Sequence, residues 1–205
     1  MNCKRPLHIR PPGRGGADGG GAAVRLAGLI FLLCVLSVPF APARGDDAAS
    51  REYQIKAAFL YKFANFVKWP AEAFSGETSP IVVGVLGKDP FGAVLDQSLK
   101  GNEAGGRSFV VKRFKDIKEM TPCHILFVSP SEQKNFSQIL GATQGAVLTV
   151  SDVPGFAKLG GIINLPSESN KIRVEVNLER SKKAGLKINS QLLGIATLVE
   201  TKVEP

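Results

Sequence analysis

The sequence has few of the residues that carry metal, thiol or triad chemistry. It contains three cysteines and two histidines among 205 residues, and only Cys123 and His124 lie beyond residue 34. Metal sites draw on clustered His, Cys and carboxylate ligands, which two neighbouring residues do not provide. A Ser-His-Asp arrangement would need His124 to act from inside an apolar run. We therefore predict neither a metal site nor a catalytic residue.

Nucleotide-binding motifs are also missing. The stretch Gly84–Asp89 superficially resembles a phosphate loop, but the residue five before Gly87 is Val82, and no Ser or Thr follows Lys88. The sequence contains no GxGxxG stretch, so a dinucleotide site has no support. A carboxylate pair for glycoside hydrolysis stays open, because only fold geometry would bring two of the scattered acids together. We predict no cofactor.

An apolar run long enough to span a membrane is missing as well. Residues 26–40 are uncharged, but a spanning helix needs about 20 apolar residues. Basic residues precede this run, and Ala41-Pro42-Ala43 follows it as a signal-peptidase motif. We expect residues 1–43 to be a cleavable signal peptide and residues 44–205 to be one exported domain without stable membrane insertion. The alternative is a retained membrane anchor.

Half of the positive charge excess leaves with this leader. The whole chain has 26 Lys+Arg and 18 Asp+Glu, a net charge of +8, whereas residues 44–205 keep 21 and 17, a net charge of +4. Small clusters at Lys112-Arg113-Lys115 and Arg180-Lys182-Lys183 are interpreted as solvated faces rather than phosphate-binding patches. Nucleic acid is therefore not an expected partner.

Apolar runs bounded by turn residues predict the fold of residues 44–205. Continuous apolar runs are typical of strands buried on both faces. Strands and helices alternate as far as residue 150, which predicts a largely parallel sheet with helices on both faces. Two later strands around a five-residue turn predict a C-terminal antiparallel hairpin. The expected fold class is α/β, a single three-layer domain, with strands at 81–87, 108–114, 123–128, 146–150, 160–165 and 172–176, and helices at 51–68, 90–99, 129–140, 177–184 and 190–199.

The first predicted helix carries an apolar stripe. Ser50 is expected to cap this helix, and Trp69-Pro70 to end it. Trp69 either covers the edge of the core, as large aromatic residues usually do, or projects as a contact anchor. The core-facing stripe is predicted to comprise Ile55, Phe59, Leu60, Phe63, Phe66 and Val67. The outward face is predicted to comprise Gln54, Tyr61, Asn65 and Lys68.

Cys123 is the first residue of the apolar run that ends at Val128. A cysteine in such a strand behaves as a small hydrophobe. Adjacent strand residues point to opposite faces, so Cys123 and His124 cannot easily act as a pair. We predict that Cys123 is buried, unpaired and inert.

The carboxyl ends of the parallel strands are the predicted place for a ligand, as in other open α/β sheets. The same residue types also suit turns and helix caps, and Asp89 followed by Pro90 is expected to cap a helix. Gly160-Gly161 either allows close approach of a partner or forms a tight turn. The strand ends carry Lys88, Asp89, Phe91, Ser129, Ser131, Ser151 and Asp152.

Several motifs, taken in order, resemble the YfiR family. The first runs from Tyr53 to Phe63 and continues through Phe66-Val67-Lys68-Trp69-Pro70. The next are Gly84-x-x-Gly87-x-Asp89-Pro90-Phe91-Gly92 and Arg107. The last are Asp152-x-Pro154-Gly155-Phe156, Gly160-Gly161-Ile162-Ile163-Asn164 and the segment from Val176 to Leu193. The resemblance covers residues 51–200.

This resemblance implies a periplasmic, non-enzymatic regulatory protein. The best-known member restrains a membrane-anchored diguanylate cyclase by binding its periplasmic sensory part, and it is a dimer in which cysteine pairs contribute to folding and regulation. Cys3 and Cys34 belong to the predicted signal peptide, so the exported domain keeps only Cys123 and an intramolecular redox switch cannot operate in it. The expected partner is a membrane sensor protein such as a diguanylate cyclase, with a homodimer as a further option.

Two other function classes stay open, a periplasmic small-molecule-binding protein and an enzyme with an unrecognised site. For the regulatory reading, the predicted partner- or ligand-binding residues are Lys68, Trp69, Asp89, Phe91, Arg107, Asp152, Gly160, Gly161 and Asn164.

Overall fold

The apolar runs of the sequence form the centre of a seven-stranded sheet. The computed structural model describes residues 45–169 and 171–201, so the predicted signal peptide lies outside the described residues. Four strands are parallel: β2 (Ile81–Leu86), β3 (Phe109–Phe114), β4 (Ile125–Val128) and β5 (Leu148–Ser151). The strand order β11-β9-β6-β5-β4-β2-β3 places β2 and β4 side by side, with β3 at one edge.

The C-terminal part of the sheet contains the predicted hairpin. Strand β6 (Ile163–Asn164) runs parallel to β5 and antiparallel to β9 (Glu175–Val176). Between them, β7 (Ser167–Glu168) and β8 (Lys171–Ile172) form a small antiparallel pair. The hairpin does not end the sheet, because β11 (Thr197–Leu198) pairs with β9 and forms the edge.

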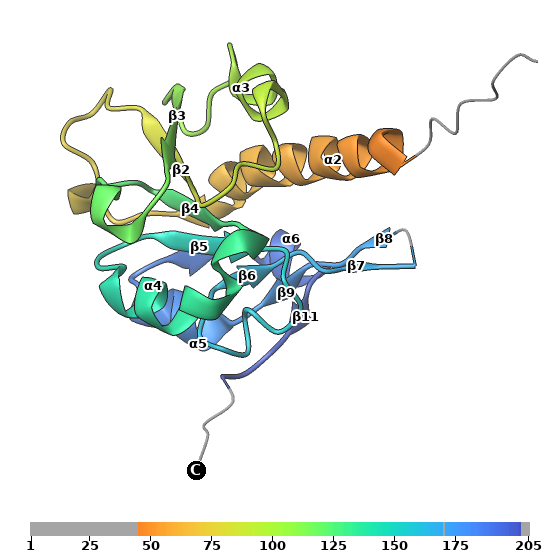
Figure 1. The fold of residues 1–205 in the computed structure, drawn as a ribbon. Coiled ribbons are helices and arrows are strands. Elements are labelled where there is room, and N and C mark those ends of the chain that lie inside the picture. The colour runs from red at the N-terminus through yellow and green to blue at the C-terminus, as the bar shows by residue number, and fades with distance from the viewer. Residues whose placement is uncertain (1–44, 170, 202–205) are drawn as a thin grey trace, which may run out of the picture. The chain divides into compact units, whose positions relative to one another are not determined.

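Helices cover both faces of the sheet, which confirms the predicted three-layer α/β fold (Figure 1). One face packs against α2 (Gly45–Phe66), α3 (Ala93–Leu99) and α6 (Ser190–Leu193). The other face packs against α4 (Phe136–Ala142), beside which lies α5 (Leu178–Lys183). Three 3-10 turns complete the described elements: η1 (Ala71–Ala73), η2 (Ile117–Glu119) and η3 (Pro130–Asn135).

Helix α2 differs from the prediction at both ends and in its buried face. It begins at Gly45, so Ser50 lies inside it and does not cap it. It ends at Phe66, and β1 (Val67–Lys68) then pairs with β10 (Lys187–Ile188). Ile55 was predicted to face the core but is 52% exposed, and Tyr61 is half-buried against Phe109 rather than turned outward. The buried stripe of α2 comprises Lys56, Ala57, Leu60, Phe63 and Ala64, and Val67 of β1 continues it.

Two other predicted helix boundaries were wrong. Asp89 does not cap α3, because the helix begins at Ala93 and Asp89 instead accepts a hydrogen bond from the backbone of Phe91. The predicted final helix, residues 190–199, consists of the four-residue α6 followed by β11. Asn189 caps α6, because its Oδ1 accepts a hydrogen bond from Gln191 N at 2.8 Å.

The strand order defines where a ligand crevice is expected. The chain enters the sheet at β2, places β3 on one side of it and β4 on the other, and so reverses direction between β2 and β4. In open α/β sheets this switch point, at the carboxyl ends of the strands, is the usual binding crevice. Gly87 ends β2 there with φ of +91°, and a Cβ atom at Gly87 would lie 2.4 Å from Ser131 Oγ. The β2 turn and the start of η3 are therefore closely packed.

Candidate functional site

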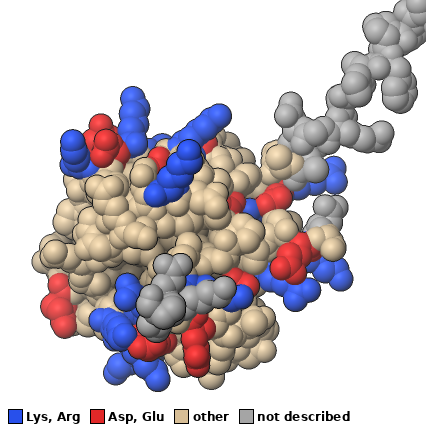
Figure 2. Space-filling view, turned by 60° about the horizontal axis from the view of Figure 1, so that its bottom comes forward, with Lys and Arg blue, Asp and Glu red and all other residues tan. Residues whose placement is uncertain are grey.

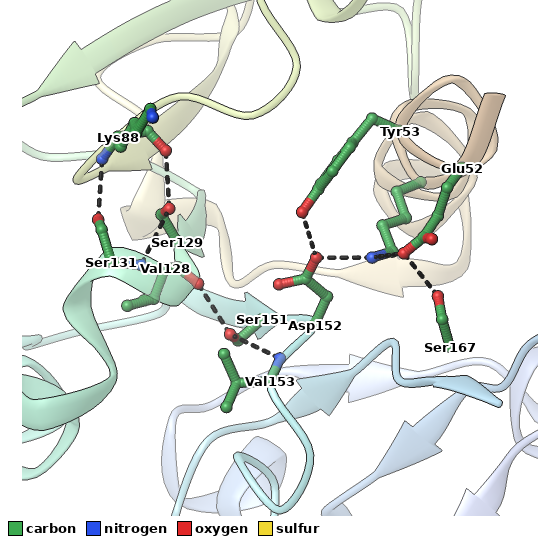
Figure 3. Close-up of polar contacts among 11 residues, drawn as sticks. Glu52, Tyr53, Lys88, Val128, Ser129, Ser131, Ser151, Asp152, Val153 and Ser167 are labelled. Atoms are coloured by element: carbon green, nitrogen blue, oxygen red, sulfur yellow. Dashed lines mark hydrogen bonds and ion pairs between the residues drawn. The ribbon is translucent and has the colours of Figure 1, made fainter. Parts of the chain in front are cut away.

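The serines at the carboxyl ends of β4 and β5 hold the turns together (Figure 3). The Ser129 hydroxyl donates to Lys88 O at 2.7 Å, and Ser131 Oγ accepts from Lys88 N at 2.9 Å. The Ser151 hydroxyl donates to Val128 O at 2.8 Å. These contacts agree with the alternative that the residues at the strand ends form turns and helix caps. His124 precedes β4 whereas Ser129 follows it, so the strand separates the imidazole from this serine.

A buried ionic cluster lies next to these serines, between α2 and the end of β5 (Figure 3). Lys56 Nζ donates to Asp152 Oδ2 at 2.6 Å and also pairs with Glu52. The Tyr53 hydroxyl donates to Asp152 Oδ2 at 2.9 Å, and the Ser167 hydroxyl donates to Glu52 Oε1 at 2.6 Å. We call these five residues the Lys56 cluster. It connects α2, the β5 end and β7.

Local geometry explains why these side chains meet. Lys56 lies one turn after Glu52 and one turn before Leu60, so all three lie along one side of α2. Val150 on β5 packs in the core under α2, and Asp152 lies two residues further along the chain, where an extended strand would again face α2. The side chains of Lys56 and Asp152 are only 2% and 4% exposed. Each charge therefore depends on the other, because an unpaired buried charge is strongly destabilising.

The charges of the Lys56 cluster do not balance. One ammonium faces two carboxylates, and Asp152 Oδ1 has no hydrogen-bond partner among the described residues. Burial, together with the negative charge of Asp152, raises the pKa of Tyr53, which therefore remains a donor. Burial alone would raise the pKa of Glu52, but hydrogen bonds from Lys56 and Ser167 outweigh it and lower that pKa below its ordinary value.

Two predicted site residues, Asp89 and Phe91, support the same edge from the β2–α3 loop. Asp89 Oδ2 accepts from Arg113 Nε at 2.7 Å, which ties the loop to β3. Phe91 is buried, and its ring packs edge-on against two other aromatic rings. The centroid of the Phe91 ring lies 5.3 Å from that of Tyr53 and 4.7 Å from that of Phe127. The structure thus brings the predicted residues Phe91 and Asp152 together around Tyr53.

Arg107 and Trp69 lie elsewhere, around His124 at the amino end of β4. The Arg107 guanidinium lies 3.8 Å from the centroid of the Phe74 ring and donates to the carbonyls of residues 76 and 79. The Phe74 ring stacks on the His124 ring with centroids 4.4 Å apart, and Trp69 Nε1 donates a hydrogen bond to His124 O at 3.3 Å. We call Trp69, Phe74, Arg107 and His124 the aromatic stack. It fixes residues 70–79 against the sheet, and it places Trp69 at the core edge.

The histidine of the aromatic stack is neutral. Its Nδ1 accepts a hydrogen bond from Val82 N at 2.9 Å, so the ring proton resides on Nε2, which donates to Ala73 O at 3.1 Å. Burial lowers the pKa of His124, and the nearby positive charge of Arg107 acts in the same direction. If the ring were protonated, its Nδ1–H would point at the backbone N–H of Val82, and the hydrogen bond between them would be lost.

Cys123 differs partly from its prediction. It precedes β4 instead of opening it, and it is half-buried. Its thiol is free among the described residues, as predicted, and burial raises its pKa to about 11. A thiol with so high a pKa is a poor nucleophile near neutral pH.

Lys68 lies exposed on β1, whereas the predicted residues Gly160, Gly161 and Asn164 pack or bond within the C-terminal half. A Cβ at Gly161 would lie 2.2 Å from the Phe156 ring, so this glycine is required for packing. Gly160 O accepts from Arg180 Nε at 2.9 Å. Asn164 is buried and donates to Glu175 Oε2 at 2.9 Å, while its Oδ1 has no partner among the described residues.

Sequence reasoning missed Glu52, Tyr53 and Lys56 as site residues. The available signal was the spacing of Tyr53, Lys56, Leu60 and Phe63, which places a lysine within an apolar helical stripe. A charged residue in such a stripe predicts a buried ionic partner.

Comparison with known proteins places this architecture in a family. The family model described as YfiR/HmsC-like matches residues 53–197. The chain belongs to the YfiR/HmsC-like family. The match begins at Tyr53 of the Lys56 cluster and ends at Thr197 of β11. A search of curated proteins found no match.

Two further observations concern the described residues. No helix within 45–169 and 171–201 combines the length and apolarity needed to cross a bilayer. In the same residues, no three His, Cys, Asp or Glu side chains are grouped so that they could hold a metal ion.

Proposed function

We propose that this YfiR/HmsC-like protein is a non-enzymatic regulator that acts in the periplasm by binding a membrane-anchored signalling enzyme, a diguanylate cyclase or a related sensor. The observation that carries this proposal is the family match over residues 53–197, which spans the sheet and the helices on both of its faces. The predicted signal peptide supports the same compartment.

The chemistry of the strand ends supports binding rather than turnover. The hydroxyls of Ser129 and Ser151 donate to backbone carbonyls, and the Tyr53 hydroxyl donates to Asp152. A catalytic serine needs an adjacent base that withdraws its proton, and a backbone carbonyl is not such a base. Here the same groups fasten α2 and the turns to the sheet, which gives a rigid scaffold for recognition.

Lys68 is the predicted site residue best placed to contact a partner. It is exposed on β1, and its cross-strand neighbour on β10 is Lys187, also exposed. Like charges directly opposite each other destabilise a strand pair. A lysine pair at this position is consistent with a partner that supplies acidic side chains. We propose that Lys68 and Lys187 contact the partner and that the other predicted residues hold the scaffold.

Capture from membranes tests this function. The tagged protein, expressed from the full chain in its native host, should retain a diguanylate cyclase or related sensor from detergent-solubilised membranes in a fixed stoichiometry. Lys68→Glu should reduce capture about tenfold, as expected when a charge at an interface becomes repulsive. Lys134→Glu, an equal charge change at an exposed position of η3, is the matched control and should have little effect.

A cellular measurement complements the capture. Deleting the gene should raise cyclic di-GMP, and the wild-type chain should restore the original level while Lys68→Glu should not. Capture of no membrane signalling protein, with unchanged cyclic di-GMP in the deletion strain, would refute the proposal. Equal effects of Lys68→Glu and Lys134→Glu would refute only the assigned contact.

A further inference from the structure

A two-part cleft lies at the amino ends of β4 and β5, at the opposite end of these strands from the Lys56 cluster. Its larger part has a volume of about 720 Å³ and is lined mainly by apolar groups, among them Met120, Pro122, Leu126 and Val147. Its smaller part, about 180 Å³, extends to Thr149 and Arg180. Both parts share residues 143, 145, 147, 183 and 184, so they adjoin between the α4–β5 loop and α5.

Arg180 supplies an uncommitted positive charge to the smaller part. It is half-buried, its Nε donates to Gly160 O at 2.9 Å, and no carboxylate forms an ion pair with it among the described residues. That single hydrogen bond fixes the guanidinium and leaves its two terminal nitrogens, which present the fork geometry that suits carboxylate and phosphate. The segment Arg180-Lys182-Lys183 was predicted to be a solvated face, and within it Arg180 is half-buried and hydrogen-bonded whereas Lys182 and Lys183 are exposed.

Other groups of the smaller part suit an anion as well. Lys183 lines both parts, and its exposed ion pair with Glu179 is weak, because solvent screens such pairs. Thr149 Oγ1 accepts from Ile162 N at 3.0 Å, which leaves the hydroxyl proton as a donor. At the larger part, the Glu72 carboxylate would repel a second anionic group. The cleft is therefore polar and positive at one end and mostly apolar at the other.

We propose that this cleft binds a small organic anion. Its carboxylate or phosphate pairs with Arg180 and Lys183, and its compact apolar body fills the larger part against Leu126 and Val147. The larger part falls within the usual volume range of small-molecule sites. The inference goes beyond the proposed function, since it requires no membrane partner and is tested on the isolated protein.

Binding titrations with defined probes test the site. Phenyl phosphate and benzoate carry the two anionic groups on one apolar ring, benzyl alcohol is their neutral counterpart, and inorganic phosphate lacks the ring. We expect saturable binding of phenyl phosphate or benzoate to the protein expressed from the full chain, followed by calorimetry and by amide shifts of residues 143–147 and 180–185. Benzyl alcohol and inorganic phosphate should each bind more weakly, because benzyl alcohol lacks the anionic group and inorganic phosphate lacks the apolar ring.

Matched variants separate a built site from general attraction. Arg180→Gln should weaken binding of the anionic probes about tenfold, because the bidentate charged partner is lost. Lys182→Gln removes an equal charge from an exposed position of the same helix that does not line the cleft, and should leave affinity within about twofold. Ala146→Phe should block the larger part and reduce binding even if Arg180→Gln fails to fold.

Several outcomes would overturn the inference. Equal weakening by Arg180→Gln and Lys182→Gln would indicate diffuse electrostatics. Amide shifts outside the cleft would place the anion elsewhere, and equal binding of benzyl alcohol would remove the role of Arg180. No saturable binding of either anionic probe would also contradict the proposal.

Discussion

At the scale of single residues, Lys56 has the clearest energetic consequence. Its ammonium lies under α2 with 2% of the side chain exposed, paired with an Asp152 carboxylate that is 4% exposed. Removing one member of such a buried pair leaves the other charge without compensation. The Lys56 cluster therefore couples the stability of α2 to that of the β5 end.

Replacing Lys56 tests this coupling. Lys56→Met should lower the free energy of unfolding by about 3 kcal/mol, because Asp152 stays buried without its cation. Glu52→Gln is the milder control, and should cost below about 1 kcal/mol because Glu52 is 35% exposed. Urea unfolding of both variants measures the difference. If Lys56→Met costs no more than Glu52→Gln, the pair does not have the assigned role.

The lowered pKa of His124 predicts how the free energy of unfolding depends on pH. Burial lowers its pKa in the folded protein below the ordinary value of 6.5, so the unfolded chain binds more protons at mildly acidic pH. The free energy of unfolding should therefore fall as pH decreases through 6.5, and the contribution of His124 should be fully present above that value. Urea unfolding at about pH 7 and about pH 5 measures this loss.

His124→Gln is the control for that experiment, since it removes the titrating group. The variant should lose less stability than the wild-type protein over the same pH interval. Glu52 does not interfere, because its pKa is lowered from 4.5 and its contribution is lost only at more acidic pH. Equal pH dependence in the two proteins would show that another group is responsible.

At the scale of elements, Gly161 controls how the turn after β5 packs before β6 begins. The Gly161→Ala methyl group would lie 2.2 Å from the Phe156 ring, so the turn or the ring must move. We expect a loss of about 2 kcal/mol, within the range for overpacked cores. Gly141→Ala in α4 is the matched control, because nothing lies within 4 Å of its added carbon. That change should gain roughly 0.5 kcal/mol from helix propensity, and chemical denaturation of the pair separates packing from propensity.

Trp69 fastens the segment after β1 to the strand edge. Its indole N–H donates to His124 O, and its ring packs edge-on to the imidazole with centroids 6.4 Å apart. Trp69→Ala should cost about 2 to 3 kcal/mol of stability, somewhat less than a fully buried tryptophan. Trp69→Phe keeps the packing without the N–H and should lose less. Unchanged stability in Trp69→Ala, with lost membrane capture, would instead make Trp69 a contact anchor.

Element prediction succeeded where the local signal and the tertiary environment agree. β2 and β4 are continuous apolar runs, and both were found within two residues of their observed bounds. β10 and β11 were missed, because each has two residues and exists only through its pairing with β1 or β9. Residues 190–199 were predicted to form one long helix instead, yet Ile195 within that range is 69% exposed.

At the scale of the whole molecule, the sequence located the carboxyl edge of the sheet but not the ionic cluster behind it. Asp152 and Phe91 were predicted because they follow strands, and both lie there. Lys56 was missed because hydrophobic periodicity counts lysine as polar wherever it occurs. The cleft containing Arg180 depends on α5 packing beside the α4–β5 loop, a long-range arrangement without a local signal. The face in Figure 2 shows Lys and Arg interspersed with Asp and Glu, in keeping with the scattered charges of the sequence.

The last prediction concerns how the chain is processed. Residues 26–40 are an uncharged run too short to span a membrane, and this run ends shortly before the junction of Ala43 and Arg44. Ala41-Pro42-Ala43 provides the small residues that signal peptidase requires at the same junction. Protein isolated from the periplasm of the native host should therefore begin at Arg44 or within a few residues of it, as intact-mass spectrometry will show. Ala43→Pro is the test variant, because proline in place of the small residue should block cleavage and shift the protein to the membrane fraction. A full-length wild-type species, released from membranes only by detergent, would show that residues 1–43 are retained as an anchor.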